Sequence, residues 1–226
     1  MDTILLERMP LTTLWIAFSM NQLKTQTVDD SAWWEQLYQA GRTPWDIGRA
    51  APPLEAYLNS PYAVPPGKIA VLGCGSGHDC MLFASKKFEV TGVDFAPSAI
   101  QKTFEKFNKA GINGTNGFLL ERDFFNIHEY DNYYDYVLEH CCFSAIDPSR
   151  RRTYFYTVRD LLVPGGKLIA LWWILDKPGG PPFSVFKDEL YALFDGMFTI
   201  DMAIVPTNSI PERKGQELLT VLTVNK

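Results

Sequence analysis

The sequence predicts an α/β fold in which a doubly wound, mostly parallel sheet of seven strands carries helices on both faces. Three observations lead to this prediction. Apolar runs of strand length alternate with helical segments along most of the chain, a pattern typical of parallel sheets. A glycine-rich turn, Gly73-Cys74-Gly75-Ser76-Gly77, follows the first of these runs. The last two runs have no clear helix between them, so the terminal strand is expected to enter the sheet antiparallel.

The expected helices have recognisable beginnings or ends. Asp29, Asp30 and Ser31 can cap a helix over 32–38, and Pro44 lies beyond its end. Asp147, followed by Pro148, is placed to begin another. In chain order, the remaining helices are expected over 54–58, 80–84, 97–110, 148–162 and 187–194. The helix over 97–110 is supported by apolar residues at helical spacing and by a glycine at its end.

The expected strands are short apolar runs bounded by polar, Gly or Pro residues. In chain order they cover 68–72, 90–93, 118–120, 133–138, 167–175, 197–205 and 218–224. The run over 162–166, Leu-Val-Pro-Gly-Gly, is expected to be the loop that precedes the fifth strand. Because parallel strands end at one edge of a sheet, the polar residues that follow these runs are expected to lie together.

The domain organisation is expected to be simple, since 226 residues suit one domain. We expect residues 28–226 to form it, with an aromatic cap over 28–60. Residues 1–27 are expected to be a disordered N-terminal extension. Within it, Leu11–Met20 is apolar but too short to cross a bilayer. Two alternatives for the extension are an upstream-start artefact and a lid helix over the site.

Composition excludes several classes of protein. The formal charge is −5, and no basic run is longer than Arg150-Arg151-Arg152, which argues against a nucleic-acid partner. The four cysteines show neither metal-ligand nor disulfide spacing. We therefore expect no metal, no membrane partner, a monomer and a location in the reducing cytoplasm.

The glycine turn is a candidate cofactor site. Strand, glycine turn and helix N-terminus bring backbone N–H groups close to a ligand. Its spacing is Gly-x-Gly-x-Gly, which differs from the pyrophosphate-binding fingerprint, and the bland alternative is a tight turn. Asp94 ends the second strand, 17 residues after Gly77, where a carboxylate can accept hydrogen bonds from a ribose. Together these features predict a nucleoside-type cofactor held by Gly73, Gly75, Gly77 and Asp94.

Two aromatic segments extend the predicted site. Trp34 and Tyr38 are four residues apart and share a helical face, and Trp45 follows in the next loop. They could form ordinary core packing, or wall a pocket for a sulfonium or another cation. Asp123 and Phe124 follow the third strand. There an Asp can accept from an exocyclic amine while an aromatic ring stacks on a base.

The chain resembles class I S-adenosylmethionine-dependent methyltransferases of the thiopurine S-methyltransferase family, especially the thiol, thiocyanate and halide methyltransferase branch. The resemblance covers about 28–226. It rests on motifs that occur in the family's order: Trp34-x3-Tyr38-x4-Thr43-Pro44-Trp45-Asp46-x-Gly48, Gly73-Cys74-Gly75-x-Gly77-His78-Asp79, Gly92-Val93-Asp94, Asp123-Phe124-Phe125, Ala145-Ile146-Asp147-Pro148-x2-Arg151, Leu162-x-Pro164-Gly165-Gly166 and Gly179-Gly180-Pro181-Pro182-Phe183. The tryptophan-rich segment and the Gly-Gly-Pro-Pro loop are the narrow signals, and the resemblance implies a Rossmann-like fold.

The resemblance also implies roles for particular residues. Trp34, Tyr38 and Trp45 would pack around S-adenosylmethionine, with Tyr38 in place of a frequent second Trp. Gly73 would contact its methionine part, Asp94 its ribose, and Asp123 and Phe124 its adenine. Arg151 and Arg213 match family arginines beside the acceptor pocket or the cofactor carboxylate; the alternative for each is a surface salt bridge.

The clearest departure from the family lies at Glu139-His140-Cys141-Cys142-Phe143-Ser144, where relatives read closer to Asp-Tyr-Thr-Phe-Phe-Cys. His140 falls where many relatives have a cofactor-contacting Tyr, so it is either a catalytic base or part of the cofactor wall. Cys141 and Cys142 are more simply explained as small core residues than as nucleophiles. This segment would lie beside the transferred methyl, which leaves the acceptor's identity open.

The expected function is transfer of the S-adenosylmethionine methyl group to a small, soft nucleophile (thiol, thiocyanate, halide or thiopurine) by in-line displacement, leaving S-adenosylhomocysteine. The alternative is an O- or N-methyltransferase of a small aromatic or carboxylate metabolite, with His140 as base. A silent S-adenosylmethionine-binding module is disfavoured by the retained Gly-Gly-Pro-Pro loop and arginines. A nicotinamide-dependent dehydrogenase is disfavoured by the glycine spacing and the two closing strands.

Overall fold

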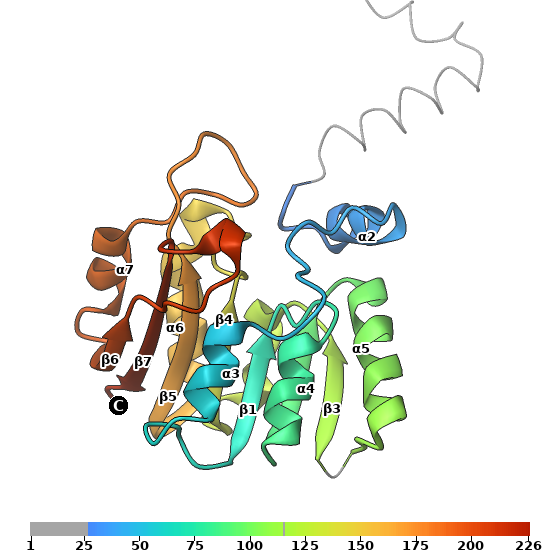
Figure 1. Ribbon diagram of the computed structural model, residues 1–226, viewed down its shortest axis with the longest axis horizontal. Helices are drawn as coiled ribbons and strands as arrows, with labels where there is room; N and C mark the ends of the chain where they lie inside the picture. The colour runs from blue at the N-terminus through green and yellow to red at the C-terminus, as the bar shows by residue number, and fades with distance from the viewer. Residues whose placement is uncertain (1–26, 115) are drawn as a thin grey trace, which may run out of the picture.

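The predicted seven-stranded sheet is confirmed, and helices cover both of its faces (Figure 1). The computed structural model describes residues 27–114 and 116–226. The expected N-terminal extension, with its alternatives, lies outside the described residues except for Thr27. The strands are β1 (Lys68–Leu72), β2 (Glu89–Asp94), β3 (Gly117–Glu121), β4 (Tyr134–His140), β5 (Leu162–Trp173), β6 (Phe198–Ile204) and β7 (Glu217–Val224).

The sheet order is β3-β2-β1-β4-β5-β7-β6, and the strand direction changes only at β7. Strands β1 to β5 pair in parallel, whereas β7 pairs antiparallel with β5 on one side and with β6 on the other. The prediction of an antiparallel terminal strand is therefore confirmed. Although β7 is last in the sequence, it lies inside the sheet, and β6 forms the edge.

Helices occur close to the predicted positions. They are α2 (Ser31–Gln39), α3 (Pro52–Leu58), α4 (His78–Ser85), α5 (Pro97–Ala110), α6 (Arg151–Leu161) and α7 (Lys187–Phe194), with short 3-10 turns η1 (Phe124–Asn126), η2 (His128–Tyr130), η3 (Pro148–Arg150) and η4 (Pro211–Arg213). None of the helices within the described ranges is long and apolar enough to cross a membrane.

Two boundaries differ from the prediction. The helix expected over 148–162 is divided, because Asp147 caps the 3-10 turn η3 through a bond from the Ser149 N–H, and α6 begins only at Arg151. Strand β5 begins at Leu162, five residues before the expected start, because Leu162 already pairs with Tyr134 across a register irregularity. The Pro-Gly-Gly sequence therefore belongs to the strand and not to a loop.

The core occupies both faces of the sheet, since successive strand residues point to opposite sides. In β1, Ala70 and Leu72 face α6 and α7, in a cluster that includes Trp172 and Tyr154. Ile69 and Val71 of the same strand face α3, α4 and α5, against Phe83 and Phe107. This double burial explains why the central strands are apolar at nearly every position.

The part of the cap over 28–48, which contains α2, lies above the carboxyl ends of the parallel strands, whereas α3 packs on one face of the sheet (Figure 1). Glu35 of α2 ties the cap to the sheet layer: its carboxylate accepts the backbone N–H of Ser98 at 2.8 Å and the Ser98 hydroxyl at 2.6 Å. Strand order reverses between β1 and β4, and such a reversal is where open α/β sheets form ligand crevices.

Candidate active site

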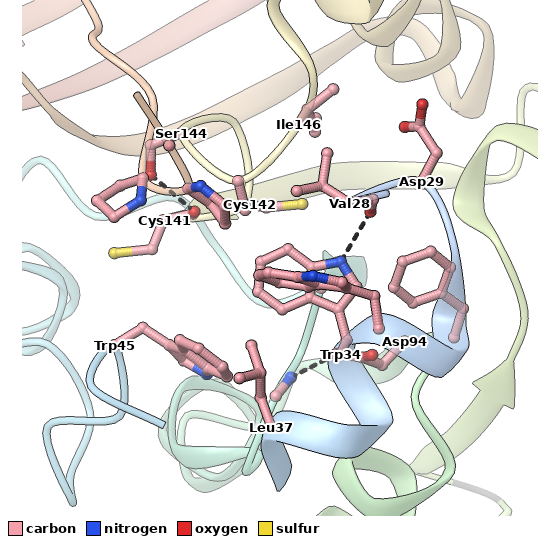
Figure 2. Close-up of a pocket in the computed structure, with 18 of the residues that line it drawn as sticks. Val28, Asp29, Trp34, Leu37, Trp45, Asp94, Cys141, Cys142, Ser144 and Ile146 are labelled. Carbon is pink, nitrogen blue, oxygen red and sulfur yellow. Dashed lines mark hydrogen bonds between the residues drawn. The ribbon is translucent and has the colours of Figure 1, made fainter. Parts of the chain in front are cut away.

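A cavity of about 480 Å³ opens between the cap and the carboxyl ends of β1, β2 and β4, a size typical of small-molecule sites. In Figure 2, Trp45 and Leu37 of the cap lie on one side, and Cys141, Cys142 and Ser144 lie opposite. Nine of the predicted site residues line it: Trp34, Tyr38, Trp45, Gly73, Gly75, Asp94, Asp123, Phe124 and His140. Gly77, Arg151 and Arg213 are not part of its lining.

The glycine turn brings backbone to the cavity wall at Gly73 and Gly75. Both have positive φ, +60° and +56°, which side chains disfavour. A Cβ on Gly73 would lie 3.0 Å from the Cys142 sulfur, and one on Gly75 would lie 3.3 Å from the Tyr38 hydroxyl. Since Cys142 and Tyr38 also line the cavity, glycine keeps open the space in which a ligand would contact the turn.

Gly77 has a different role. Its φ is +75°, and a Cβ there would lie 2.5 Å from two side-chain atoms of Thr103 on α5. It precedes α4, so glycine at this position lets α4 and α5 approach each other. Its predicted contact with a cofactor stays a prediction, and its position shows a packing role.

Asp94 lies at the end of β2, where the sequence places it, and it is almost fully buried. Its two oxygens accept the N–H groups of Gly75 at 3.0 Å and Ala96 at 2.9 Å. Burial raises the pKa of Asp94 to about 6, although these N–H bonds act in the opposite direction. The carboxylate is thus held rigidly at the cavity wall, with lone pairs left for a ligand's hydroxyl groups.

The aromatic residues of the cap contact one another around the cavity. The Trp45 ring lies edge-on to Trp34 and Tyr38, with centroids 5.4 and 5.7 Å apart. The Trp45 indole N–H donates to the Tyr38 hydroxyl at 3.4 Å, and that of Trp34 donates to the Val28 carbonyl at 2.7 Å. These rings pack together and also line the cavity. Their predicted role around a sulfonium or another cation stays a prediction.

Asp123 and Phe124 line the cavity beyond the end of β3. Asp123 caps η1: its Oδ1 accepts the Phe125 N–H at 3.0 Å, and its Oδ2 accepts the Asn126 side-chain amide at 3.2 Å. Phe124 packs edge-on against Tyr154, with centroids 5.8 Å apart. The carboxylate is therefore fixed in place beside an aromatic surface.

His140 lies at the end of β4, and both of its ring nitrogens have protein partners. Nδ1 is 2.6 Å from Asp79 Oδ2, and Arg213 Nη1 is 3.2 Å from Nε2. Burial lowers the pKa of His140, but Cys141 and Asp79 together raise it well above its usual value. Because arginine only donates, the contact with Arg213 calls for a lone pair on Nε2 and a proton on Nδ1. Burial alone would raise the pKa of Asp79, but the His140 ring and the Ala51 N–H hold it below its usual value.

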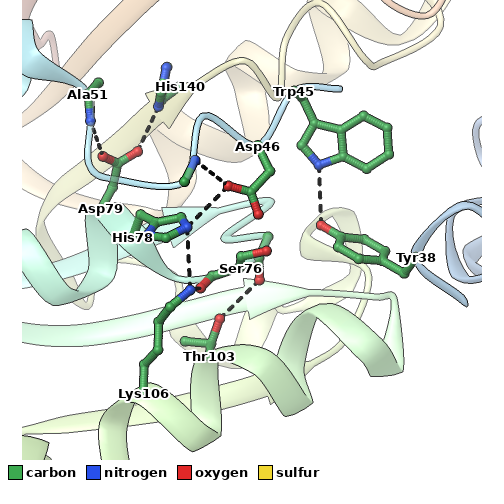
Figure 3. A network of polar contacts seen from close by, with 12 residues as sticks. Tyr38, Trp45, Asp46, Ala51, Ser76, His78, Asp79, Thr103, Lys106 and His140 are labelled. Atoms are coloured by element: carbon green, nitrogen blue, oxygen red, sulfur yellow. Dashed lines mark hydrogen bonds and ion pairs between the residues drawn. The ribbon is translucent and has the colours of Figure 1, made fainter. Parts of the chain in front are cut away.

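A second histidine–carboxylate pair ties the cap to the glycine turn (Figure 3). His78 Nε2 lies 3.1 Å from Asp46 Oδ1, which also accepts the Gly48 N–H at 2.8 Å. Burial would raise the pKa of Asp46, and bonds from Ser76 and Gly48 lower it below its ordinary value. The contact between Asp46 and His78 therefore holds the neighbouring Trp45 at the cavity, which gives a structural reason for both residues in the sequence motifs.

The segment over 139–144, which departs from the family's sequence pattern, forms the cavity wall opposite the cap. Cys141 has a positive φ of +65° and accepts a bond from Arg213 Nη1 at 3.0 Å. Burial raises the pKa of the Cys142 thiol. Glu139 is buried outside the lining, where it accepts the Phe143 N–H at 2.8 Å and the Tyr154 hydroxyl at 2.7 Å. Burial raises the pKa of Glu139 to about 7.

The two predicted arginines lie behind the wall. Arg151 is 4% exposed, stacks on Phe143 and binds both oxygens of Glu189, at 2.7 and 2.9 Å. Arg213 is 3% exposed and supports His140, Cys141 and the Trp45 carbonyl. Arg151 therefore fits the salt-bridge alternative better than a direct contact with an acceptor. Its own side chain, however, is buried and does not lie at the surface.

Several lining residues were not predicted, chiefly Trp33, Arg42, Arg150 and Trp173. Trp33 and Arg150 adjoin predicted residues, so the sequence motifs identify their segments without indicating which side chain faces inward. Trp173 ends β5, and its position at a strand end was a usable signal. Among residues 27–114 and 116–226, no three His, Cys, Asp or Glu side chains gather as ligands for a metal ion.

The lining fits a nucleoside bound through its ribose. An open cradle at Gly73 and Gly75, a buried carboxylate at Asp94 and an aromatic–carboxylate pair at Phe124 and Asp123 follow one another along one wall. The tryptophans of the cap add ring faces suited to a positively charged sulfur. This chain can therefore hold S-adenosylmethionine with its own described residues.

Comparison with known proteins gives a consistent result. A family model described as Thiopurine S-methyltransferase (TPMT) matches residues 29–222. Thiocyanate methyltransferase 1 of Brassica oleracea is 35% identical over 199 residues, covering 86% of this chain and 85% of that protein. Probable thiol methyltransferase 2 of Arabidopsis thaliana is 32% identical over 193 residues, covering 84% of each chain. The fold is also that of the 1,6-didemethyltoxoflavin-N1-methyltransferase of Burkholderia thailandensis, solved with S-adenosylhomocysteine, at a TM-score of 0.67, 21% identity and 87% coverage of both chains.

Proposed function

The chain belongs to the thiopurine S-methyltransferase family and is an S-adenosylmethionine-dependent methyltransferase, and we propose that its acceptor is a small, soft nucleophile such as a thiol, thiocyanate, a halide or a thiopurine. Relatives named as thiocyanate, thiol and thiopurine methyltransferases support this acceptor class. These relatives are named for different acceptors, so the side chains that line the cavity are needed to narrow the acceptor class.

The observation that carries the proposal is that the Asp and His side chains of the described lining already have protein partners. Asp29 binds Arg150, Asp94 and Asp123 hold backbone N–H groups, and His140 is bound at both nitrogens. An alcohol or phenol needs a base to take its proton. Thiocyanate and halides bind as anions, and a thiol with a pKa near 8.5 is partly ionised at neutral pH.

The residues then act by binding, orienting and excluding water. S-adenosylmethionine supplies an electrophilic methyl group on a positively charged sulfur. Trp34 and Trp45 shield that region and favour a positive charge against their ring faces. Asp94 and the glycine turn fix the nucleoside end, so that alignment and loss of water can supply most of the rate acceleration. We propose in-line displacement because a soft nucleophile can attack the activated methyl group directly while S-adenosylhomocysteine leaves.

The alternative, O- or N-methylation with His140 as catalytic base, requires Arg213 to leave Nε2. Arg213 is buried and also holds Cys141 and the Trp45 carbonyl, so this loss would disturb the wall. We therefore propose that His140 is a wall residue whose ring Asp79 and Arg213 hold in place.

The test is release of S-adenosylhomocysteine by the purified protein with iodide, thiocyanate, hydrosulfide, a thiopurine, a phenol and an aromatic amine. We expect turnover with at least one sulfur or halide acceptor. Turnover only with the phenol or amine, lost in His140→Ala but kept in the exposed control His128→Ala, would establish the alternative. No product with any sulfur or halide acceptor would refute the proposal.

We also propose that the protein acts as a monomer in the cytoplasm. All four cysteines are unpaired, which supports a reducing compartment. Size-exclusion chromatography with light scattering at working concentration tests the first part.

A further inference from the structure

We infer that Arg150 is a positioning residue that fastens the N-terminal cap over the S-adenosylmethionine cavity. Its guanidinium lines the cavity and contacts three groups. Nη1 donates to Asp29 Oδ1 at 2.7 Å, Nη2 lies 4.0 Å from Asp123 Oδ2, and the guanidinium carbon lies 3.9 Å from the centre of the Phe125 ring. We call this set of four residues, Arg150, Asp29, Asp123 and Phe125, the clasp.

The clasp joins three segments that are distant in sequence. Asp29 belongs to the turn before α2, in which the Val28 carbonyl accepts the Trp34 indole N–H. Asp123 and Phe125 belong to η1 on the domain side, and Arg150 ends η3. Because Val28 and Trp34 both line the cavity, the contact with Asp29 determines how closely the start of the cap approaches the opposite wall.

The charges explain why a cation is needed at this point. Asp29 and Asp123 meet different nitrogens of the same guanidinium, Nη1 and Nη2. Without Arg150, two carboxylates would share this part of the lining with no cation between them, so its removal both loses attraction and adds repulsion. An arginine suits the position better than a lysine, since its planar group can lie on Phe125 while its edges meet two carboxylates.

The clasp is partly exposed, with the Arg150 and Asp29 side chains 30% and 40% exposed. Its strength should therefore depend on salt, as it does for exposed ion pairs. The neighbouring arginines have other partners: Arg151 is buried against Glu189, and Arg152 is exposed and contacts Tyr156. The three consecutive arginines thus supply an internal control.

The experiment measures S-adenosylmethionine binding by calorimetry and its dissociation by stopped-flow tryptophan fluorescence, so it does not depend on the acceptor. We expect Arg150→Gln to raise Kd about tenfold, mainly through faster dissociation. Asp29→Asn should give a similar loss, and the double variant should lose less than the sum of the two. Raising salt should weaken binding more in the wild type than in Arg150→Gln.

Arg152→Gln is the matched control and should bind as the wild type does. The inference is overturned if Arg150→Gln changes Kd by less than about twofold, if Arg152→Gln loses as much, or if the losses of Arg150→Gln and Asp29→Asn add fully. Should Arg150→Gln fail to fold, the Kd and salt dependence of Asp29→Asn decide the question, with the same thresholds.

Discussion

Replacing Gly77 with alanine should destabilise the fold, whereas replacing Gly75 should weaken cofactor binding. At Gly77 a Cβ would lie 2.5 Å from Thr103 Cγ2 and Oγ1, at a φ of +75°. A left-handed non-glycine residue costs about 1–2 kcal/mol, and an extra methyl group in a packed site costs about 1–3 kcal/mol. We therefore expect Gly77→Ala to lower the free energy of unfolding by about 3 kcal/mol, and the Tm by roughly 6–12 °C for a chain of this size.

The Gly75→Ala variant should show the opposite balance. Its Cβ would lie 3.3 Å from the Tyr38 hydroxyl and 3.9 Å from the Gly73 carbonyl oxygen, and Gly75 and Tyr38 both line the cavity. We expect about 1–2 kcal/mol from the backbone alone and a loss of S-adenosylmethionine affinity of at least about tenfold. Gly111→Ala is the control for the backbone cost, since its φ is +69° and its Cβ would meet nothing within 4 Å.

Urea unfolding and calorimetric titration of the three variants test this reasoning. Gly77→Ala should lose more stability than Gly111→Ala while binding the cofactor nearly as well as the wild type does when folded. The reasoning is refuted if Gly77→Ala is no less stable than Gly111→Ala. It is equally refuted if folded Gly77→Ala loses as much affinity as Gly75→Ala, because Gly77 would then be a cofactor contact after all.

Two further predictions concern pH. Burial raises the pKa of Asp94 to about 6. The affinity for S-adenosylmethionine should therefore be constant above neutral pH and fall by up to about tenfold per pH unit below 6, as the Asp94 carboxylate becomes protonated. Binding titrations across this range should give a weak affinity that does not change with pH in Asp94→Asn. Burial raises the pKa of Glu139 to about 7 from an ordinary 4.5, so the folded protein keeps a proton that the unfolded chain releases between these values. Stability should therefore fall as pH rises through this window, by at most about 3 kcal/mol, and urea unfolding from pH 5 to 8 should show a smaller fall in Glu139→Gln.

The fold was predictable because strands buried on both faces of the sheet are continuous apolar runs in the sequence. Strands such as Lys68–Leu72 are apolar at nearly every position, and polar or Gly-rich segments bound them. The start of β5 was not predictable in this way. Leu162 pairs with Tyr134 only because a register irregularity absorbs the following residues, and a Pro-Gly-Gly sequence contains no sign of a partner strand.

The site divides along a similar line. Asp94, Asp123 and His140 follow strands, and the topology alone brings such residues to one edge. The choice among Arg150, Arg151 and Arg152 depends on where η3 ends and α6 begins, since successive helical side chains are rotated by about 100°. The motif therefore identified the segment, but the inward-facing arginine is Arg150 and not the predicted Arg151.

The attachment of residues 28–48 of the cap explains how the site beneath them can admit its ligand. The only buried apolar cluster that joins the cap's tyrosine to α5 within the described residues is small, formed by Tyr38, Ala96 and Ala99. Most other ties are polar: Glu35 to Ser98, Asp46 to His78, and Arg150 to Asp29. Polar ties at a partly exposed surface open at a lower free-energy cost than the unfolding of an apolar core does. We therefore expect residues 28–48 of the cap to separate from the strand ends while α3 and the sheet stay packed.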